Sequence, residues 1–388
     1  MIITTTEELK EICQRFATYP FVTVDTEFLR EYTYYSKLCL IQMASKDEAI
    51  CIDPLSKQMD LSPLFELMMN KNVVKVFHSA RQDIENFYYL MKKVPTPLFD
   101  TQIAAMVCGY GDCIGYQELV HDLLNIQIDK GMRYTNWEQR PLNVAQLEYA
   151  LNDVTYLRDV YLILKQKLET SGRLNWIDEE MALLMDKETY DPSDESLAKK
   201  IKYNVKSERL KFLYQDLYIW RERRAQKYNQ SKKQILKDET LLDITKAHPK
   251  TVDELKNLRG IPQSFFKKNI ADELIRVVNQ SLLKNKEDFY PISLMKNKSG
   301  ACKNLMIMLH LLRELVSVKE KIAFKIIATN DELMAFASGD ELVRFMQSWR
   351  YDIFGKYALE IKNGNLLFSY NPKTHQVDFC TQDSFLVK

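Results

Sequence analysis

The sequence has few residues that break regular structure and no long apolar run. Of its 388 residues only 10 are glycine and 11 are proline, whereas 46% are hydrophobic and 28% are charged. This composition is typical of a soluble globular protein that can bury a sizeable core, and little of the chain need be disordered. No segment approaches the roughly 18 apolar residues of a membrane span, and the first residues lack a basic and apolar leader. We therefore expect neither a membrane protein nor a secreted one, and the length predicts two or three domains.

The cysteines lack any pairing pattern. There are seven of them, an odd number, scattered from Cys13 to Cys380. Because such a set forms no disulfide framework, we predict a reducing, cytoplasmic location. Cys108 and Cys113 have no histidine or cysteine pair nearby, so we expect no zinc site and interpret them as core or loop thiols.

The whole chain has no excess of charge of one sign, but its segments do. The formal net charge is +1, yet residues 1–196 carry 19 basic and 31 acidic side chains, and residues 197–290 carry 22 basic and 12 acidic ones. An acidic front joined to a basic middle suits a metal-binding catalytic unit attached to a surface that holds a polyanion. Solvated helix faces would give the same asymmetry.

The first half of the chain alternates strand-like and helix-like segments. Short β-rich or apolar runs are predicted to be strands at 21–28, 38–44, 49–52 and 73–77. Helical spacing of apolar residues predicts helices at 61–70, 82–92 and 145–170. This order predicts an α/β domain with a mixed sheet over residues 1–190.

The second half is predicted to be helical. A polar segment at 188–206 contains Pro192, which ends any helix that enters it. One or two all-α helical domains are then predicted, one at 206–285 with a long amphipathic helix at 208–228 and a second at 298–388 that ends in a β-hairpin.

The C-terminal end carries a hairpin signal. Leu359 and Ile361 precede the pair Asn363 and Gly364, and further apolar residues follow it. Because Asn-Gly suits the positive φ angles of a type I′ turn, we predict a β-hairpin with its turn at this pair.

Two carboxylates lie in the strand-like segment FVTVDTEF. Residues two apart in a strand point to the same face, so Asp25 and Glu27 project together, with Val22, Val24 and Phe28 on the opposite face. Carboxylates about 7 Å apart repel each other unless a cation lies near them. Their hard oxygen atoms suit Mg²⁺ or Mn²⁺, although Asp-x-Glu is also common on plain surfaces.

Two further segments carry acidic side chains. In YALND, Tyr149 and Asp153 lie one turn apart on the polar side of a helix whose other face is apolar. In FHSARQDIENF, Asp83 falls in the first turn of a predicted helix, where the helix dipole alone would favour it. Each segment is ordinary by itself, and their order and spacing together are distinctive.

In that order and spacing, the three segments resemble the exonuclease motifs of the DEDD superfamily, in its tyrosine-bearing branch, and within it ribonuclease D. The segments VDTEFLREYTYYSKLCLIQMA, FDTQIAA and DKGMRYTNWEQRPL are similar to that family as well, and the resemblance covers residues 1–185. It implies a ribonuclease H-like fold for the front domain.

The resemblance continues into the helical half. Residues 220–260 resemble an HRDC domain, a small helical module that binds nucleic acid, and residues 328–355 are similar to the C-terminal part of bacterial ribonuclease D. The second match is a diverged HRDC-like one, and the C-terminal hairpin has no counterpart in that module.

The resemblance implies a 3′-5′ exoribonuclease that releases 5′-mononucleotides from RNA with a free 3′ end, with tRNA precursors as the implied substrates. Asp25, Glu27 and Asp153 would hold one of two divalent ions (Mg or Mn), and Asp25 would bridge to a second that Asp83 supports. Tyr149 would orient the attacking water, because a phenol with an unperturbed pKa near 10 is a poor base.

Candidate substrate contacts surround these residues. Phe28 and Leu29 could pack on the terminal nucleotide or in the core. Three residues of the segment before the catalytic helix could contact RNA or anchor the loop: Lys130, Trp137 and Arg140.

In the basic middle, cations interleaved with Trp220 and Tyr228 suit phosphate contact and stacking, although a surface helix gives a similar pattern. These cations are Arg221, Arg223, Arg224, Lys227, Lys232 and Lys233. His78 is expected to be packed and hydrogen-bonded, and Asp100 to cap a helix.

Two other functions stay open. A DNA 3′-5′ exonuclease would use the same five residues, since contacts to a 2′-OH cannot be seen in a sequence, while the flanking ribonuclease D segments favour RNA. A catalytically weak RNA-binding adaptor would usually lack a carboxylate, and none is missing here.

Overall fold

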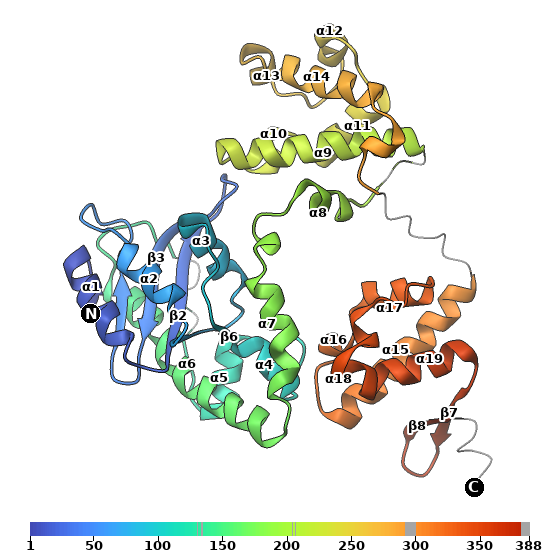
Figure 1. Cartoon of the computed structure of the whole chain (residues 1–388). Coiled ribbons are helices and arrows are strands. Elements are labelled where there is room, and N and C mark those ends of the chain that lie inside the picture. Colours follow the sequence, from blue (N-terminus) through green and yellow to red (C-terminus); the bar gives the residue numbers. More distant parts are fainter. Residues whose placement is uncertain (130, 133–134, 204, 206, 292–299, 382–388) are drawn as a thin grey trace.

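The computed structural model describes residues 1–129, 131–132, 135–203, 205, 207–291 and 300–381 (Figure 1). The predicted RNA contact of Lys130 therefore lies outside the described residues. No helix within these ranges has the length and the apolar content that a membrane crossing needs.

The front of the chain folds around a mixed sheet, as the sequence predicts. Its strands pair in the order β1-β4-β3-β2-β5-β6, with β3 antiparallel to both of its neighbours and the other pairs parallel. Their bounds are β1 Ile2–Ile3, β2 Phe21–Leu29, β3 Lys37–Ala44, β4 Ala49–Ile52, β5 Val74–Phe77 and β6 Leu98–Asp100. The strands predicted at 21–28, 38–44, 49–52 and 73–77 are confirmed to within one residue at each end.

Helices cover both faces of this sheet. They are α1 Thr6–Phe16, α2 Ser62–Met69, α3 Arg81–Met91, α4 Thr101–Val107, α5 Tyr116–Leu124 and α6 Val144–Thr170. Val22 and Val24 pack with α1, α2 and α3 in one apolar cluster. Thr23 points the other way, and its hydroxyl donates to the Val154 carbonyl of α6 at 2.7 Å. The alternation of β2 therefore turns Asp25, two residues further on, toward α6.

The long helix α6 begins at a well-defined cap. The Asn143 side chain accepts from the Gln146 amide, and the Gln146 side chain accepts from the Asn143 amide, which forms a capping box. From there the buried positions recur at three- and four-residue spacing, among them Ala150, Val154 and Leu157. Burial of this stripe fixes the direction in which Tyr149 and Asp153 project.

The middle of the chain forms a helical domain with its own apolar cluster. After α7 Asp178–Met185 and α8 Asp194–Lys199 come α9 Glu208–Tyr228, α10 Lys232–Ile235, α11 Asp238–Ala247, α12 Val252–Lys256, α13 Gln263–Lys267 and α14 Ile270–Leu283. This domain contacts the loop that follows β2 (Figure 1). The Tyr34 hydroxyl donates to Glu222 at 2.5 Å, and the Tyr35 amide donates to Asn229 at 2.9 Å.

The apolar core of the last part of the chain is continuous with that of the front domain. The elements of this last part are α15 Gly300–Glu320, α16 Phe324–Ile327, α17 Asn330–Ala337, α18 Ser348–Arg350, α19 Lys356–Asn363, β7 Leu366–Asn371 and β8 Gln376–Thr381. Their buried side chains belong to the same cluster as Val76, Phe99 and Leu157 of the front domain. The rings of Trp176 and Trp349 stack across the contact with centroids 4.1 Å apart. The domain boundaries predicted near residues 190, 206, 285 and 298 stay predictions.

The predicted position of the C-terminal hairpin turn is wrong. Leu359 and Ile361 lie in α19, and Gly364, at φ +80°, ends that helix. The hairpin is formed by β7 and β8, whose turn lies further along the chain at 372–375. Asn-Gly supplies a positive φ that serves a helix C-terminus as well as a tight turn, so the pair alone did not distinguish the two.

Candidate active site

The five predicted catalytic residues line one cavity of about 520 Å³. Asp25 and Glu27 reach it from β2, Asp83 from the first turn of α3, and Tyr149 and Asp153 from α6. Residues at the start of α4 and α5 complete its wall, among them Gln102, Tyr116 and Gln117.

Three of the carboxylates form a cluster that suits a cation. Asp25, Glu27 and Asp153 each offer one oxygen atom, and these atoms lie within 4.8 Å of one another. Burial, together with the nearby charge of Asp153, raises the pKa of Asp25 well above its ordinary value. A set of half-buried hard oxygen atoms under mutual repulsion is the donor set that a divalent ion such as Mg²⁺ or Mn²⁺ prefers.

Asp83 is held by a chain of hydrogen bonds. The Thr26 hydroxyl donates to the Asp83 carboxylate at 2.5 Å, the Asn86 amide donates to the Thr26 hydroxyl at 3.3 Å, and the Ser36 hydroxyl donates to the Asn86 side chain. All four residues are buried. Burial and the charge of Asp25 raise the pKa of Asp83 well above its ordinary value, and the bond from Thr26 acts against this rise.

The predicted RNA contacts of Trp137 and Arg140 are not supported by their positions. Trp137 is 2% exposed, and its ring lies 6.1 Å from that of Tyr149, so it packs against the proposed catalytic tyrosine. The Arg140 guanidinium pairs with Asp53 at 2.7 Å and donates to the Cys39 carbonyl. Both side chains anchor the segment before α6, which is the alternative that the sequence left open.

Strand alternation predicts that Phe28 lies on the face opposite the carboxylates, and this prediction is wrong. The register of β2 shifts between Glu27 and Phe28, and Phe28 lines the same cavity as Asp25. Contact with a terminal nucleotide stays a prediction for Phe28. Leu29 lines a different cavity, beside Thr135.

The interpretations of His78 and Asp100 are confirmed. The His78 ring nitrogens lie 3.0 Å from the Thr101 hydroxyl and 3.2 Å from the Ile114 carbonyl, and burial lowers the pKa of the ring. Asp100 caps α4 by accepting from the Gln102 amide, and its carboxylate also accepts from the Ala80 amide before α3. It thereby ties the starts of the two helices together.

The arginines of α9 use their donors inside the fold. Arg221 is 4% exposed and donates to the Leu236 carbonyl, so its predicted contact with RNA is not supported. Arg223 binds Asp194 and the Pro192 carbonyl, and Arg224 binds Glu273. Lys227 is exposed, and phosphate contact stays a prediction for it.

Sequence reasoning did not find Thr26, Asn86 or Tyr116. Thr26 and Asn86 act through Asp83, and neither belongs to a motif. Strand alternation assigns Thr26 to the face away from Asp25, so it gave no reason to place Thr26 at the site. Tyr116 lines the cavity and donates its hydroxyl to the Asn152 carbonyl at 2.9 Å. Burial, and then the charge of Asp153, raises the pKa of its phenol.

Known proteins show the same architecture. A family model described as a 3′-5′ exonuclease matches residues 1–169, and one described as an HRDC domain matches residues 211–278. The crystal structure of Escherichia coli RNase D is 25% identical, with a TM-score of 0.82 over 94% of this chain and 98% of that one. The fold and the cavity thus define a 3′-5′ exonuclease that carries an HRDC domain.

Relatives of similar length identify the family. The ribonucleases D of Bartonella henselae and of Nitrobacter hamburgensis are each 42% identical to this chain, over 95% and 94% of its length and over 91% and 96% of their own. The chain belongs to the ribonuclease D family and is a 3′-5′ exoribonuclease. Its substrate is RNA, and the family implies divalent metal ions as cofactors.

Proposed function

We propose that this exoribonuclease trims the 3′ ends of tRNA precursors in the cytoplasm and releases 5′-mononucleotides. Its active site would be Asp25, Glu27, Asp83, Tyr149 and Asp153. The observation that carries the site is the cluster of three carboxylate oxygens within 4.8 Å of one another, with Asp83 in the same cavity. A structured substrate is supported by the Escherichia coli relative, which is described as an exoribonuclease involved in structured RNA processing.

The residues fit two divalent ions, Mg²⁺ or Mn²⁺. Asp25, Glu27 and Asp153 would hold one ion, while Asp25 and Asp83 would serve the second. Ions bound there supply positive charge to the attacking and leaving oxygen atoms of the phosphodiester. The raised pKa values of Asp25 and Asp83 support this fit, because a cation would offset the repulsion that contributes to them.

Uncharged side chains would position the attacking water and the terminal nucleotide. The Tyr149 hydroxyl would hold the attacking water by a hydrogen bond, with its ring steadied by Trp137. Phe28 would pack on the last nucleotide, and the wall formed by His78 and Tyr116 would stop the chain from passing through. A cavity closed in this way admits only an end, which is what an exonuclease requires.

One set of substrates tests the proposal. The purified protein is incubated with Mg²⁺ or Mn²⁺ and one of three substrates: a 3′-extended tRNA, the same RNA with a blocked 3′ end, or single-stranded DNA. We expect stepwise shortening of the first substrate with release of nucleoside 5′-monophosphates, and no shortening after chelation of the metal. Equal cleavage of the blocked RNA would contradict an exonuclease, and preferred cleavage of DNA would contradict the substrate.

A further inference from the structure

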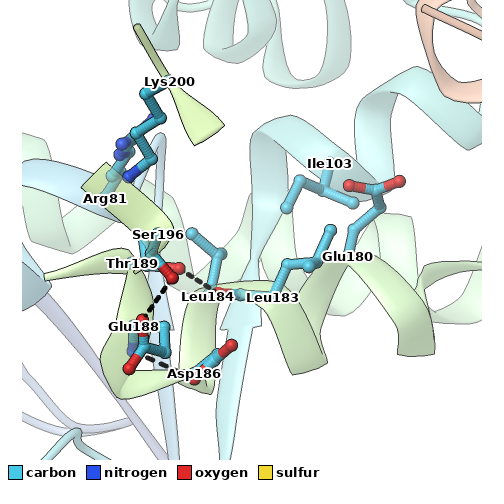
Figure 2. Close-up of a pocket in the computed structure, with 10 residues that line it drawn as sticks. All are labelled: Arg81, Ile103, Glu180, Leu183, Leu184, Asp186, Glu188, Thr189, Ser196 and Lys200. Carbon is cyan, nitrogen blue, oxygen red and sulfur yellow. Dashed lines mark hydrogen bonds between the residues drawn. The ribbon is translucent and has the colours of Figure 1, made fainter. Parts of the chain in front are cut away.

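A second cavity, of about 430 Å³, lies outside the proposed active site (Figure 2). It is formed by the starts of α3 and α4, by α7, by the turn that follows α7, and by α8. Its apolar wall consists of Ile103, Leu183 and Leu184, and the other lining side chains are polar or charged.

The acidic groups of this cavity are already satisfied. Glu180 accepts from Arg344 and Arg350, each at 2.7 Å. Glu188 accepts from the Ser196 hydroxyl at 2.6 Å, and such bonds lower its pKa to about 2, while Asp186 accepts from the Glu188 amide at 3.0 Å. These carboxylates therefore have partners within the fold.

The cationic groups are not satisfied in this way. Arg81 and Lys200 both line the cavity, and both residues are exposed. Within the described part of the chain, neither side chain forms a hydrogen bond or an ion pair. In Figure 2 they lie at one end of the cavity, with Glu180 at the other. Two cations without carboxylate partners favour an anion between them.

The second cavity adjoins the proposed active site. Arg81 lines the second cavity, while its neighbour Gln82 lines the cavity of Asp25 and Asp83. Likewise, Ile103 lines the second cavity and Gln102 the first. The first turns of α3 and α4 are thus a shared wall, and a strand whose 3′ end lies at Asp83 needs only to cross that wall to reach Arg81.

We propose that this cavity binds a nucleotide of the RNA upstream of the scissile bond, with its phosphate at Arg81 and Lys200 and its base or ribose against Leu183, Leu184 and Ile103. The inference rests on the proposed function, since it places the substrate strand relative to Asp25 and Asp83. A phosphate with an apolar ring system beside it matches the chemistry of the cavity.

Equilibrium binding tests the site apart from catalysis. The Asp25→Asn variant, which we expect not to hydrolyse RNA, serves as the background for fluorescence anisotropy with a labelled, unstructured RNA. Adding Arg81→Gln and Lys200→Gln should weaken binding about tenfold and reduce the slope of log affinity against log salt by about 0.7 for each phosphate that is no longer neutralised. With active enzyme, the same pair should raise KM more for a long RNA than for a dinucleotide.

The matched control is Lys10→Gln with Lys71→Gln. These lysines are exposed in the front domain and line neither cavity, and the pair removes the same charge. An equal loss of affinity in the control pair would show only an effect of net charge and would overturn the site. Unchanged affinity and salt slope in the test pair would overturn it as well. If the wild-type protein binds RNA through Arg81 and Lys200 but never shortens it, the proposed function fails and the binding site stands.

Discussion

At the scale of single residues, Asp25 is half-buried beside Asp153, and the pKa of its carboxyl is raised above the unfolded value. Between the unfolded and the folded pKa, the folded protein binds more protons than the unfolded one. The free energy of unfolding of the metal-free protein therefore falls as the pH rises through that window. The fold thus holds the carboxylates together at a cost to stability when no cation is bound.

We expect Asp25→Asn to raise the melting temperature of the metal-free protein, because the substitution removes this repulsion with little change in volume. The gain should be larger at pH 8 than at pH 5, and each kcal/mol corresponds to about 2–4 °C in a domain of this size. Thermal melts in a chelator measure it, with the exposed Glu11→Gln as the control. A gain that is the same at both pH values would contradict the assigned cause.

Tyr149→Phe should slow hydrolysis and leave some activity. The variant loses one positioning hydrogen bond and keeps every carboxylate, and loss of a positioned group typically costs roughly 10²–10⁴-fold in rate. Single-turnover kinetics and Mn²⁺ calorimetry distinguish the possible roles. A wild-type rate would make the tyrosine structural, and loss of metal binding would make it a ligand.

Thr26→Val should weaken metal binding although Thr26 is not a proposed ligand. Without the hydroxyl, Asp83 loses its 2.5 Å bond and the Asn86 amide loses its acceptor. Removal of such a supporting hydrogen bond typically costs about 10–100-fold in metal affinity or activity. Thr26→Ser keeps the hydroxyl and should restore most of the affinity for Mn²⁺ in calorimetry. Equal losses in both variants would mean that packing matters and the hydrogen bond does not.

The sequence predicted the residues that carry charge and missed those that position them. Asp25, Glu27, Asp83, Tyr149 and Asp153 stand in spaced motifs, and the fold brings them into one cavity. Thr26 reaches Asp83 across 57 residues, and Trp137 meets Tyr149 through ring packing. Such contacts depend on how β2, α3 and α6 pack, which alternation and helical spacing within each element do not encode.

At the scale of elements, regular periodicity was the reliable signal. The long helix predicted at 208–228 has those bounds in the structure, and the strand predicted at 49–52 does as well. The prediction failed where one local signal serves two structures, as at Gly364, and where a strand departs from regularity, as between Glu27 and Phe28. In both places the tertiary environment determines the conformation.

One buried arginine takes part in the contact between α7 and the C-terminal part. Arg350 is 1% exposed, and it pairs with Glu179 and with Glu180. Arg350→Met removes the cation and leaves two glutamates without it, a loss of roughly 1–3 kcal/mol once their partial exposure is considered. We expect a lower melting temperature and faster proteolysis of residues 300–381.

The control for Arg350→Met is Lys362→Gln, which breaks the more exposed pair with Glu341 inside the C-terminal part. That change should cost well under about 1 kcal/mol. If the two variants melt and are cleaved alike, the α7 contact does not depend on the buried pair.

At the scale of the whole molecule, the charge asymmetry of the sequence has a more specific meaning in the structure. The arginines of α9 are committed to contacts within the chain, whereas Lys227, Lys233 and Lys268 are exposed, so we expect such exposed cations of the middle domain to attract RNA. The C-terminal part shares an apolar core with the front domain. A cut near residue 190 would remove the C-terminal part from the apolar surface around Trp176 and Met181, so the front domain would lose part of its own packing.

We propose that the carboxylate cluster at Asp25 performs the hydrolysis. The most direct test of this proposal is the rate at which the Asp25→Asn variant shortens a 3′-extended tRNA at saturating Mn²⁺, measured beside the wild type on protein whose melt shows that it is folded. We expect stepwise shortening by the wild type and none by the variant. Near-normal turnover by the folded variant would contradict it.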